Sequence, residues 1–331
     1  MPDGNQWWTR TRAMSNQKTT RYVLRVLQVA IAVTALAFAY HALSVQWASS
    51  SAQLAQLHPD WSWIALSGMI FLATYAVLLE TWREVLRTWS SRLGFVSAAR
   101  IWTISNLGRY VPGKVWQIGA MGVMAERANV SPIAATGSAI LNVVVNLVAG
   151  FLIAAAFGWP LLNLPQVAGG RAPAIVFVLG TVVVLAALPR ALPAMVRRLS
   201  RITGRDFGAA TFPAAAIVIS VVGNLVAWVL YGTAFATFAR GIIGSTHGPI
   251  TAYTAVYALS YLVGYLVLFA PAGVGFREAA MIALLPAAHL ATPAQAAVLA
   301  VTSRLWLTVL EIAPGALFLT FDGLRRRPRE Q

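Results

Sequence analysis

The chain has 331 residues, of which 58% are hydrophobic and only 11% are charged, and its mean hydropathy is +0.69. Soluble chains carry about 25% charged residues, so this chain lacks the polar surface needed to face water. The composition excludes a soluble enzyme and a disordered chain, and the absence of cysteine excludes a disulfide-stapled domain and thiolate chemistry. Apolar runs recur at about the 20-residue length that crosses a bilayer as a helix. The sequence therefore predicts a polytopic all-α membrane protein.

The charge is strongly basic, with 25 Lys and Arg against 10 Asp and Glu and a net charge of +15. In a membrane protein such an excess indicates basic cytoplasmic loops and contact with anionic lipid headgroups, so nucleic acid is not an expected partner. The apolar run that follows the basic N-terminus is too long for a cleaved signal sequence. We expect it to remain as the first membrane helix.

The arrangement of the apolar segments follows from the distribution of basic residues. The segments are residues 22–43, 62–82, 98–124, 132–157, 172–188, 211–238, 250–288 and 294–321. Eight full crossings would place the five arginines between 190 and 205 outside, against the positive-inside rule. If 98–124 and 250–288 enter and leave on one side, 19 of the 25 basic residues lie inside. We therefore expect about six transmembrane helices and two re-entrant hairpins in the cell inner membrane, with both termini cytoplasmic.

Each expected hairpin is interrupted by residues that helices tolerate poorly. The first break contains Pro112 and Gly113, and the second contains Pro271, Gly273 and Gly275. Proline removes a backbone donor, and glycine lowers helix stability. Non-helical backbone at membrane depth persists only where protein buries it or where it lines a wet cavity. Two kinked full-length helices are the alternative to re-entrant hairpins.

The two breaks belong to a weak internal repeat. Each is followed by an acidic residue, Glu126 or Glu278, and then by a Ser/Thr-Pro pair that favours a helix start, at 131–132 or 292–293. In the six-crossing topology the first unit enters from the cytoplasm and the second from outside. The repeats are therefore predicted to be inverted, an architecture typical of alternating-access transporters.

The predicted domain plan has three parts. A basic cytoplasmic tail covers residues 1–21, a membrane domain covers 22–321, and a second basic cytoplasmic tail covers 322–331. Within the membrane domain the first repeat spans about 62–157 and the second about 211–321.

Two sequence motifs resemble a known family. Residues 106–116 (NLGRYVPGKVW), with AER at 125–127, and residues 270–278 (APAGVGFRE) together resemble the lysylphosphatidylglycerol synthase transmembrane-region family, over roughly residues 20–325. One departure is Ala272, where the family usually has a second glycine. The resemblance implies a flippase-like domain that moves a lipid headgroup across the bilayer. Because the chain ends ten residues after Phe321, we expect a stand-alone member without the synthase domain, and no enzyme activity.

The ionisable residues near the breaks are candidates for binding an anionic headgroup. Each costs about 2.5–3.5 kcal/mol to insert at mid-membrane, so such residues usually face the interior and serve function. Arg109 and Lys114 flank the first break, Arg277 and Glu278 follow the second, and Arg304 lies in the last helix. Guanidinium groups bind phosphate bidentately, and helix N-termini attract anions. We expect the three arginines to form a phosphate-binding core, assisted by Lys114.

The acidic and amide residues have less specific interpretations. Glu278 would orient an arginine, receive a cationic headgroup or take up a proton, and Glu126 is its repeat counterpart; ion pairs that only fix the hairpins are the alternative. Asn142 and Asn146 are interpreted as helix-packing residues, with cavity lining as the alternative. The cluster at residues 80–84 is interpreted as interfacial ion pairs.

The sequence also bears on other classes of function. The four histidines have no metal-ligand spacing, and no phosphate-cradling loop occurs, so we expect no metal, no cofactor and no ATP hydrolysis. The expected partners are membrane lipids, with an anionic lipid of the phospholipid or polyprenyl-phosphate type as the substrate. A homodimer or an envelope-synthesis enzyme is a further expected partner. An ion-coupled small-solute carrier and an accessory subunit of an envelope-lipid synthesis complex are the alternatives.

Overall fold

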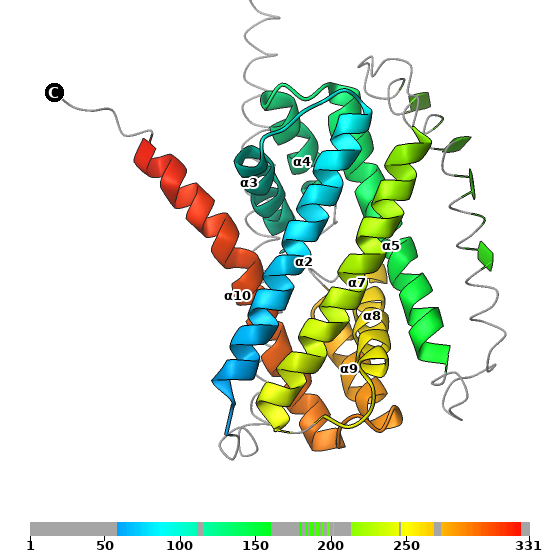
Figure 1. Ribbon diagram of the computed structural model, residues 1–331, viewed down its shortest axis with the longest axis vertical. Coiled ribbons are helices and arrows are strands. Elements are labelled where there is room, and N and C mark those ends of the chain that lie inside the picture. The colour runs from blue at the N-terminus through cyan, green and yellow to red at the C-terminus, as the bar shows by residue number, and fades with distance from the viewer. Residues whose placement is uncertain are drawn as a thin grey trace, which may run out of the picture.

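A computed structural model describes residues 58–110, 115–159, 213–244, 246–267 and 273–325, with scattered positions between 179 and 201. Within these ranges the chain forms eight α-helices, one 3-10 turn and no strand (Figure 1). The all-α prediction is confirmed for this part of the chain. The expected segment 22–43, most of 172–188 and the N-terminal tail lie outside the described residues.

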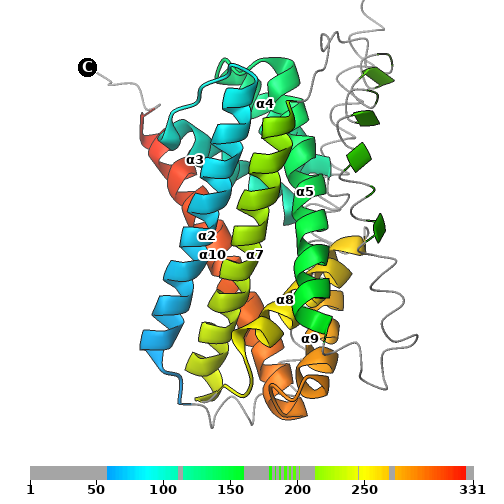
Figure 2. The ribbon, with the colours of Figure 1, turned by 45° about the vertical axis from the view of Figure 1, so that its right-hand side comes forward.

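Among the residues that the structure describes, four helices are long and apolar enough to cross a membrane. They are α2 (Trp61–Thr88), α5 (Pro132–Gly158), α7 (Ala214–Ile243) and α10 (Pro293–Arg325). In Figures 1 and 2, α2 and α10 run in one direction and α5 and α7 in the other. The last helix continues four residues beyond the expected boundary at 321, into the predicted C-terminal tail.

The two Ser/Thr-Pro pairs begin helices, as predicted. The Ser131 hydroxyl accepts a hydrogen bond from the Ala134 amide at 3.3 Å, and Pro132 is the first helical residue of α5. Before α10, the Thr292 hydroxyl accepts from the Gln295 amide at 3.2 Å, and the Gln295 side chain accepts from the Thr292 amide at 3.0 Å. Both caps satisfy amide groups that the first turn of a helix leaves without partners.

The two broken segments form hairpins rather than kinked spans. The first consists of α3 (Phe95–Asn106), η1 (Leu107–Tyr110) and α4 (Val115–Arg127), and the second of α8 (Ile250–Leu266) and α9 (Phe276–Ala287). These helices have 12 to 17 residues, fewer than the roughly 20 that a crossing needs. Within each hairpin the two helices pack on one another. The hairpins lie at opposite ends of the bundle (Figure 2). Each segment is therefore a pair of packed helices among the described residues, and its entry and exit on one side of the membrane stays a prediction.

Close packing at glycines holds the central helix α7 against α2. A Cβ atom at Gly223 would lie 2.0 Å from the Thr81 hydroxyl, and one at Gly241 would lie 2.9 Å from the Ile64 side chain. Small residues allow membrane helices to approach closely and gain van der Waals contact. On another face α7 exposes Val218, Val222, Val226 and Val229 at helical spacing. This aliphatic stripe suits contact with lipid tails.

The expected cluster at residues 80–84 forms ion pairs. Arg83 bonds to Glu80, and Arg87 bonds to Glu84, each one turn apart on α2. The pairs lie toward the C-terminal end of α2, the end that carries the first hairpin in Figure 1. Their partial exposure fits the edge of a membrane.

Candidate functional site

The second break is built on glycine backbone. Gly273 and Gly275 have φ angles of +71° and +86°, in the left-handed region that favours glycine. Helix α9 then begins at Phe276, so Arg277 and Glu278 occupy its first turn. The Gly275 amide donates to the Glu278 carboxylate at 2.6 Å, which anchors this acidic side chain to the break.

Three of the predicted site residues lie together at this break. The exposed fractions of Arg277, Glu278 and Arg304 are 6%, 4% and 8%. The Arg304 Nε atom lies 3.8 Å from the Glu278 carboxylate, joining the last helix to the start of α9. Removing ions from water costs several kcal/mol each unless they are paired, so this charged group needs its internal partners.

Arg277 packs against two tyrosine rings of α8. Its guanidinium carbon lies 4.8 Å from the Tyr257 ring centre and 5.8 Å from that of Tyr261. Such cation–π contacts are strongest when they are desolvated, as here. The Nη2 atom is buried and has no hydrogen-bond partner among the described residues. A buried donor in this state has unused capacity to bind an anion.

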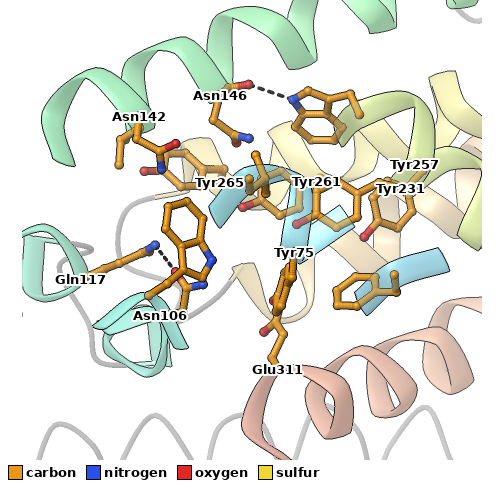
Figure 3. Close-up of a pocket in the computed structure, with 15 residues that line it drawn as sticks. Tyr75, Asn106, Gln117, Asn142, Asn146, Tyr231, Tyr257, Tyr261, Tyr265 and Glu311 are labelled. Carbon is orange, nitrogen blue, oxygen red and sulfur yellow. Dashed lines mark hydrogen bonds between the residues drawn. The ribbon is translucent and has the colours of Figure 1, made fainter. Parts of the chain in front are cut away.

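A cavity has the Tyr257 and Tyr261 rings in its wall, and Arg277 is not among its lining residues (Figure 3). Its lining comes from all four long helices, from both helices of the first hairpin and from α8. The cavity therefore lies between the two hairpins, in the interior of the bundle.

Five tyrosines form much of the lining. Tyr257, Tyr261 and Tyr265 recur every four residues on one face of α8, and Tyr75 and Tyr231 come from α2 and α7. The Tyr257 ring stacks on Tyr231, with centres 6.0 Å apart, and the Tyr261 ring stacks on Tyr265 at 6.1 Å. These tyrosines are not among the site residues predicted from the sequence. The recurrence of tyrosine at every fourth position of an otherwise apolar helix is the sequence pattern that could have indicated them.

Four carboxamides also contribute to the polar lining, and two of them join the arms of the first hairpin. The Gln117 side chain, on α4, donates to the Asn106 side chain, on α3, at 2.5 Å. Asn146 donates to Asn224 of α7 at 2.9 Å, which is the packing role that the sequence predicted. Asn146 and Asn142 also line the cavity, so the packing interpretation is incomplete.

Glu311 is the one charged side chain among the described residues that line the cavity. Its carboxylate accepts a hydrogen bond from the Tyr110 hydroxyl at 2.6 Å. Tyr110 belongs to η1 at the first break, so this contact ties the first hairpin to the last helix. Hydrogen bonds to a charged group are stronger than neutral ones, about 1.5–3 kcal/mol each.

The remaining predicted site residues are placed differently. Glu126 lies in the last turn of α4, at the end of the first hairpin that is far from its break. It does not join the three charged residues at the second break. The Arg109 backbone lies in η1, but its side chain falls outside what the structure describes, as do Pro112, Gly113, Lys114 and Pro271. Within the described ranges, no three His, Asp or Glu side chains gather as metal ligands.

Comparison with protein families gives a match over most of the chain. Residues 25–315 match the family described as the Lysylphosphatidylglycerol synthase TM region, whose members carry a non-catalytic, flippase-like domain. No curated protein matches the chain. The matched range covers both hairpins and the cavity between them.

Proposed function

Because the chain belongs to the lysylphosphatidylglycerol synthase TM-region family, we propose that it translocates a lipid headgroup across the cytoplasmic membrane without ATP hydrolysis. The lipid we propose is anionic, of the phospholipid or polyprenyl-phosphate type. The observation that carries the proposal is the cavity between the hairpins, which has polar groups from both of them in its lining. A crossing headgroup must exchange its water for such groups, because unpaired polar groups at mid-membrane are costly.

The lipid tails have a separate place in this proposal. They stay in the bilayer against aliphatic faces such as the exposed valine stripe of α7. Only the headgroup enters the bundle, where the two breaks shorten the path between the membrane surfaces. Inverted repeats with broken helices support such a route, because rocking one repeat against the other opens the site to each side in turn.

The anionic part of the headgroup is assigned to the second break. Arg277 lies directly behind Tyr257 and Tyr261, two rings of the cavity wall, and its Nη2 atom has unused donor capacity within the described structure. A change in the positions of these rings would bring the guanidinium to the cavity surface. Arginine would then bind a phosphate group with two parallel hydrogen bonds.

The test is a headgroup-accessibility assay in liposomes that contain the purified full-length chain. Fluorescent phosphatidylglycerol and a polyprenyl phosphate are followed as a membrane-impermeant reductant bleaches the outer leaflet. The proposal expects fast exchange with the native chain and a rate at least tenfold lower with Arg277→Gln, because a charged hydrogen bond of about 1.5–3 kcal/mol is lost. The matched control is Arg240→Gln. The Arg240 guanidinium lies 4.0 Å from the centre of the Trp63 ring, and neither residue lines the cavity.

Two results would contradict the proposal. One is the absence of exchange for every anionic lipid, with or without a pH gradient, from a chain that remains folded. The other is an equal loss of rate in Arg277→Gln and Arg240→Gln, which would indicate damage to the bundle rather than to a site. Transport of a water-soluble solute in place of lipid would favour the carrier alternative.

A further inference from the structure

The cavity lining has a chemistry of its own that the anionic lipid does not explain. Among the described lining residues there are eight aromatic rings and four carboxamides, and no lysine or arginine. A phosphate or carboxylate that leaves water needs strong donors in direct contact, and cationic side chains supply them best. As described, this lining would hold a bare anion poorly.

The lining suits a ligand that is rich in hydroxyl groups. A carboxamide both donates and accepts hydrogen bonds, and tyrosine hydroxyls do the same, so together they match hydroxyls of either orientation. Asn142 lines the cavity, so its carboxamide places both a donor and an acceptor there (Figure 3). Aromatic faces provide apolar surface for the C–H faces of a sugar ring.

The charges around the cavity favour a neutral group over a cationic one. Glu311 would attract an amine, but its carboxylate already accepts a hydrogen bond from Tyr110. The Tyr257 and Tyr261 rings already make cation–π contacts with the Arg277 guanidinium. An aromatic cage for a ligand cation would place a second positive charge beside this arginine, and like charges repel.

We propose that the cavity between the hairpins binds a glycosyl group, so that the translocated lipid is a glycolipid whose sugar ring occupies the Tyr and Asn lining. This inference rests on the proposed function and names the substrate class of the same site. The sugar ring packs against the stacked tyrosines of α8, and its hydroxyls bond to Asn142 of α5 and to Gln117 of α4. Any phosphate between the sugar and the tails is then directed toward the breaks.

Measuring lipid binding to the full-length chain in detergent tests directly whether the cavity prefers a glycosylated headgroup. Quenching of tryptophan fluorescence is a suitable signal, because Trp102 and Trp228 line the cavity. The probes are a short-chain glucosyl diacylglycerol, short-chain phosphatidylglycerol, short-chain phosphatidylcholine and free glucose. We expect the glucosyl lipid to bind at least tenfold more tightly than the other two lipids, as two or three added hydrogen bonds would give.

Two variants test the lining without removing charge. Asn142→Leu keeps the size of the side chain and removes its hydrogen bonds, so the tenfold preference should fall to about twofold or less while phosphatidylglycerol binding is unchanged. Tyr261→Phe should weaken glucosyl lipid binding severalfold. The matched control is Tyr253→Phe, because Tyr253 lies on the same helix but donates to the Leu290 carbonyl outside the cavity. This control should retain the full preference.

The outcomes separate this inference from the proposed function. If phosphatidylglycerol exchanges between leaflets but the glucosyl lipid binds no better, or if Asn142→Leu leaves the preference unchanged, the glycosyl assignment is wrong and translocation stands. A preference for phosphatidylcholine that depends on Glu311 also overturns it, in favour of a cationic headgroup. If free glucose binds and crosses the membrane while no lipid is exchanged, both proposals fail and the chain is a sugar carrier.

Discussion

The close backbone approach of Gly273 to α8 in the second hairpin provides a sharp test of how the site is held. A Cβ atom added at Gly273 would lie 2.6 Å from the Gly264 carbonyl oxygen and 2.7 Å from its carbonyl carbon and Cα. All three atoms belong to the backbone of α8, which cannot move aside as a flexible side chain can. Gly273 also has a φ of +71°, so alanine is disfavoured there for two independent reasons.

The two costs can be estimated separately. A left-handed backbone costs about 1–2 kcal/mol for a residue with a Cβ atom. Overpacking against fixed atoms costs about 1–3 kcal/mol more. Gly273→Ala should therefore lower the free energy of unfolding by about 2–5 kcal/mol. If the chain instead adapts by separating α8 from α9, Arg277 moves relative to Tyr257 and Tyr261, and translocation slows.

Unfolding of the purified chain in mixed micelles, titrated with sodium dodecyl sulfate, measures the stability. Gly244→Ala is the matched control, because Gly244 has a φ of +75° but nothing within 4 Å of an added Cβ atom. In this control the free energy of unfolding should fall by only about 1–2 kcal/mol, the cost of the left-handed backbone. Equal destabilisation of the two variants would refute the argument from close approach, and an unchanged Gly273→Ala variant would refute both parts of it.

Three further predictions concern other contacts of the bundle. Gly223→Ala should cost about 1–3 kcal/mol, since its Cβ atom would meet the Thr81 side chain, and Thr81→Ala in the same chain should recover part of this loss in a double-mutant cycle. Tyr110→Phe and Glu311→Gln should each lower the free energy of unfolding, because each removes one partner of the same hydrogen bond. Their effects should not add, and unfolding titrations of the double variant should give a coupling energy of about 1.5–3 kcal/mol. Additive losses would show that this hydrogen bond contributes nothing to stability. Glu84→Gln should change stability by no more than about 0.5 kcal/mol, because its ion pair is partly exposed; a loss of several kcal/mol would place this pair in the core.

Local patterns in the sequence determined much of the fold. The length and apolarity of the runs predicted the four long helices, and the Ser131 and Thr292 caps predicted where two of them begin. Proline and glycine marked both breaks, and the distribution of arginine indicated which segments turn back. These features depend on residues near one another in the chain, so a linear pattern suffices to read them. The two motifs at the breaks likewise sufficed to identify the family.

The tertiary structure decided the chemistry of the site. The sequence directed attention to arginines, and the structure places Arg277 behind a tyrosine wall rather than on the cavity surface. The lining joins residues as distant in the chain as Tyr75 and Glu311, from seven different helices. Which side chains meet there depends on how helices cross and rotate against each other, and close contacts such as Gly223 on Thr81 set those rotations. The sequence pattern within one helix does not indicate which other helix it packs against. The packing of the helices therefore determines which side chains line the cavity.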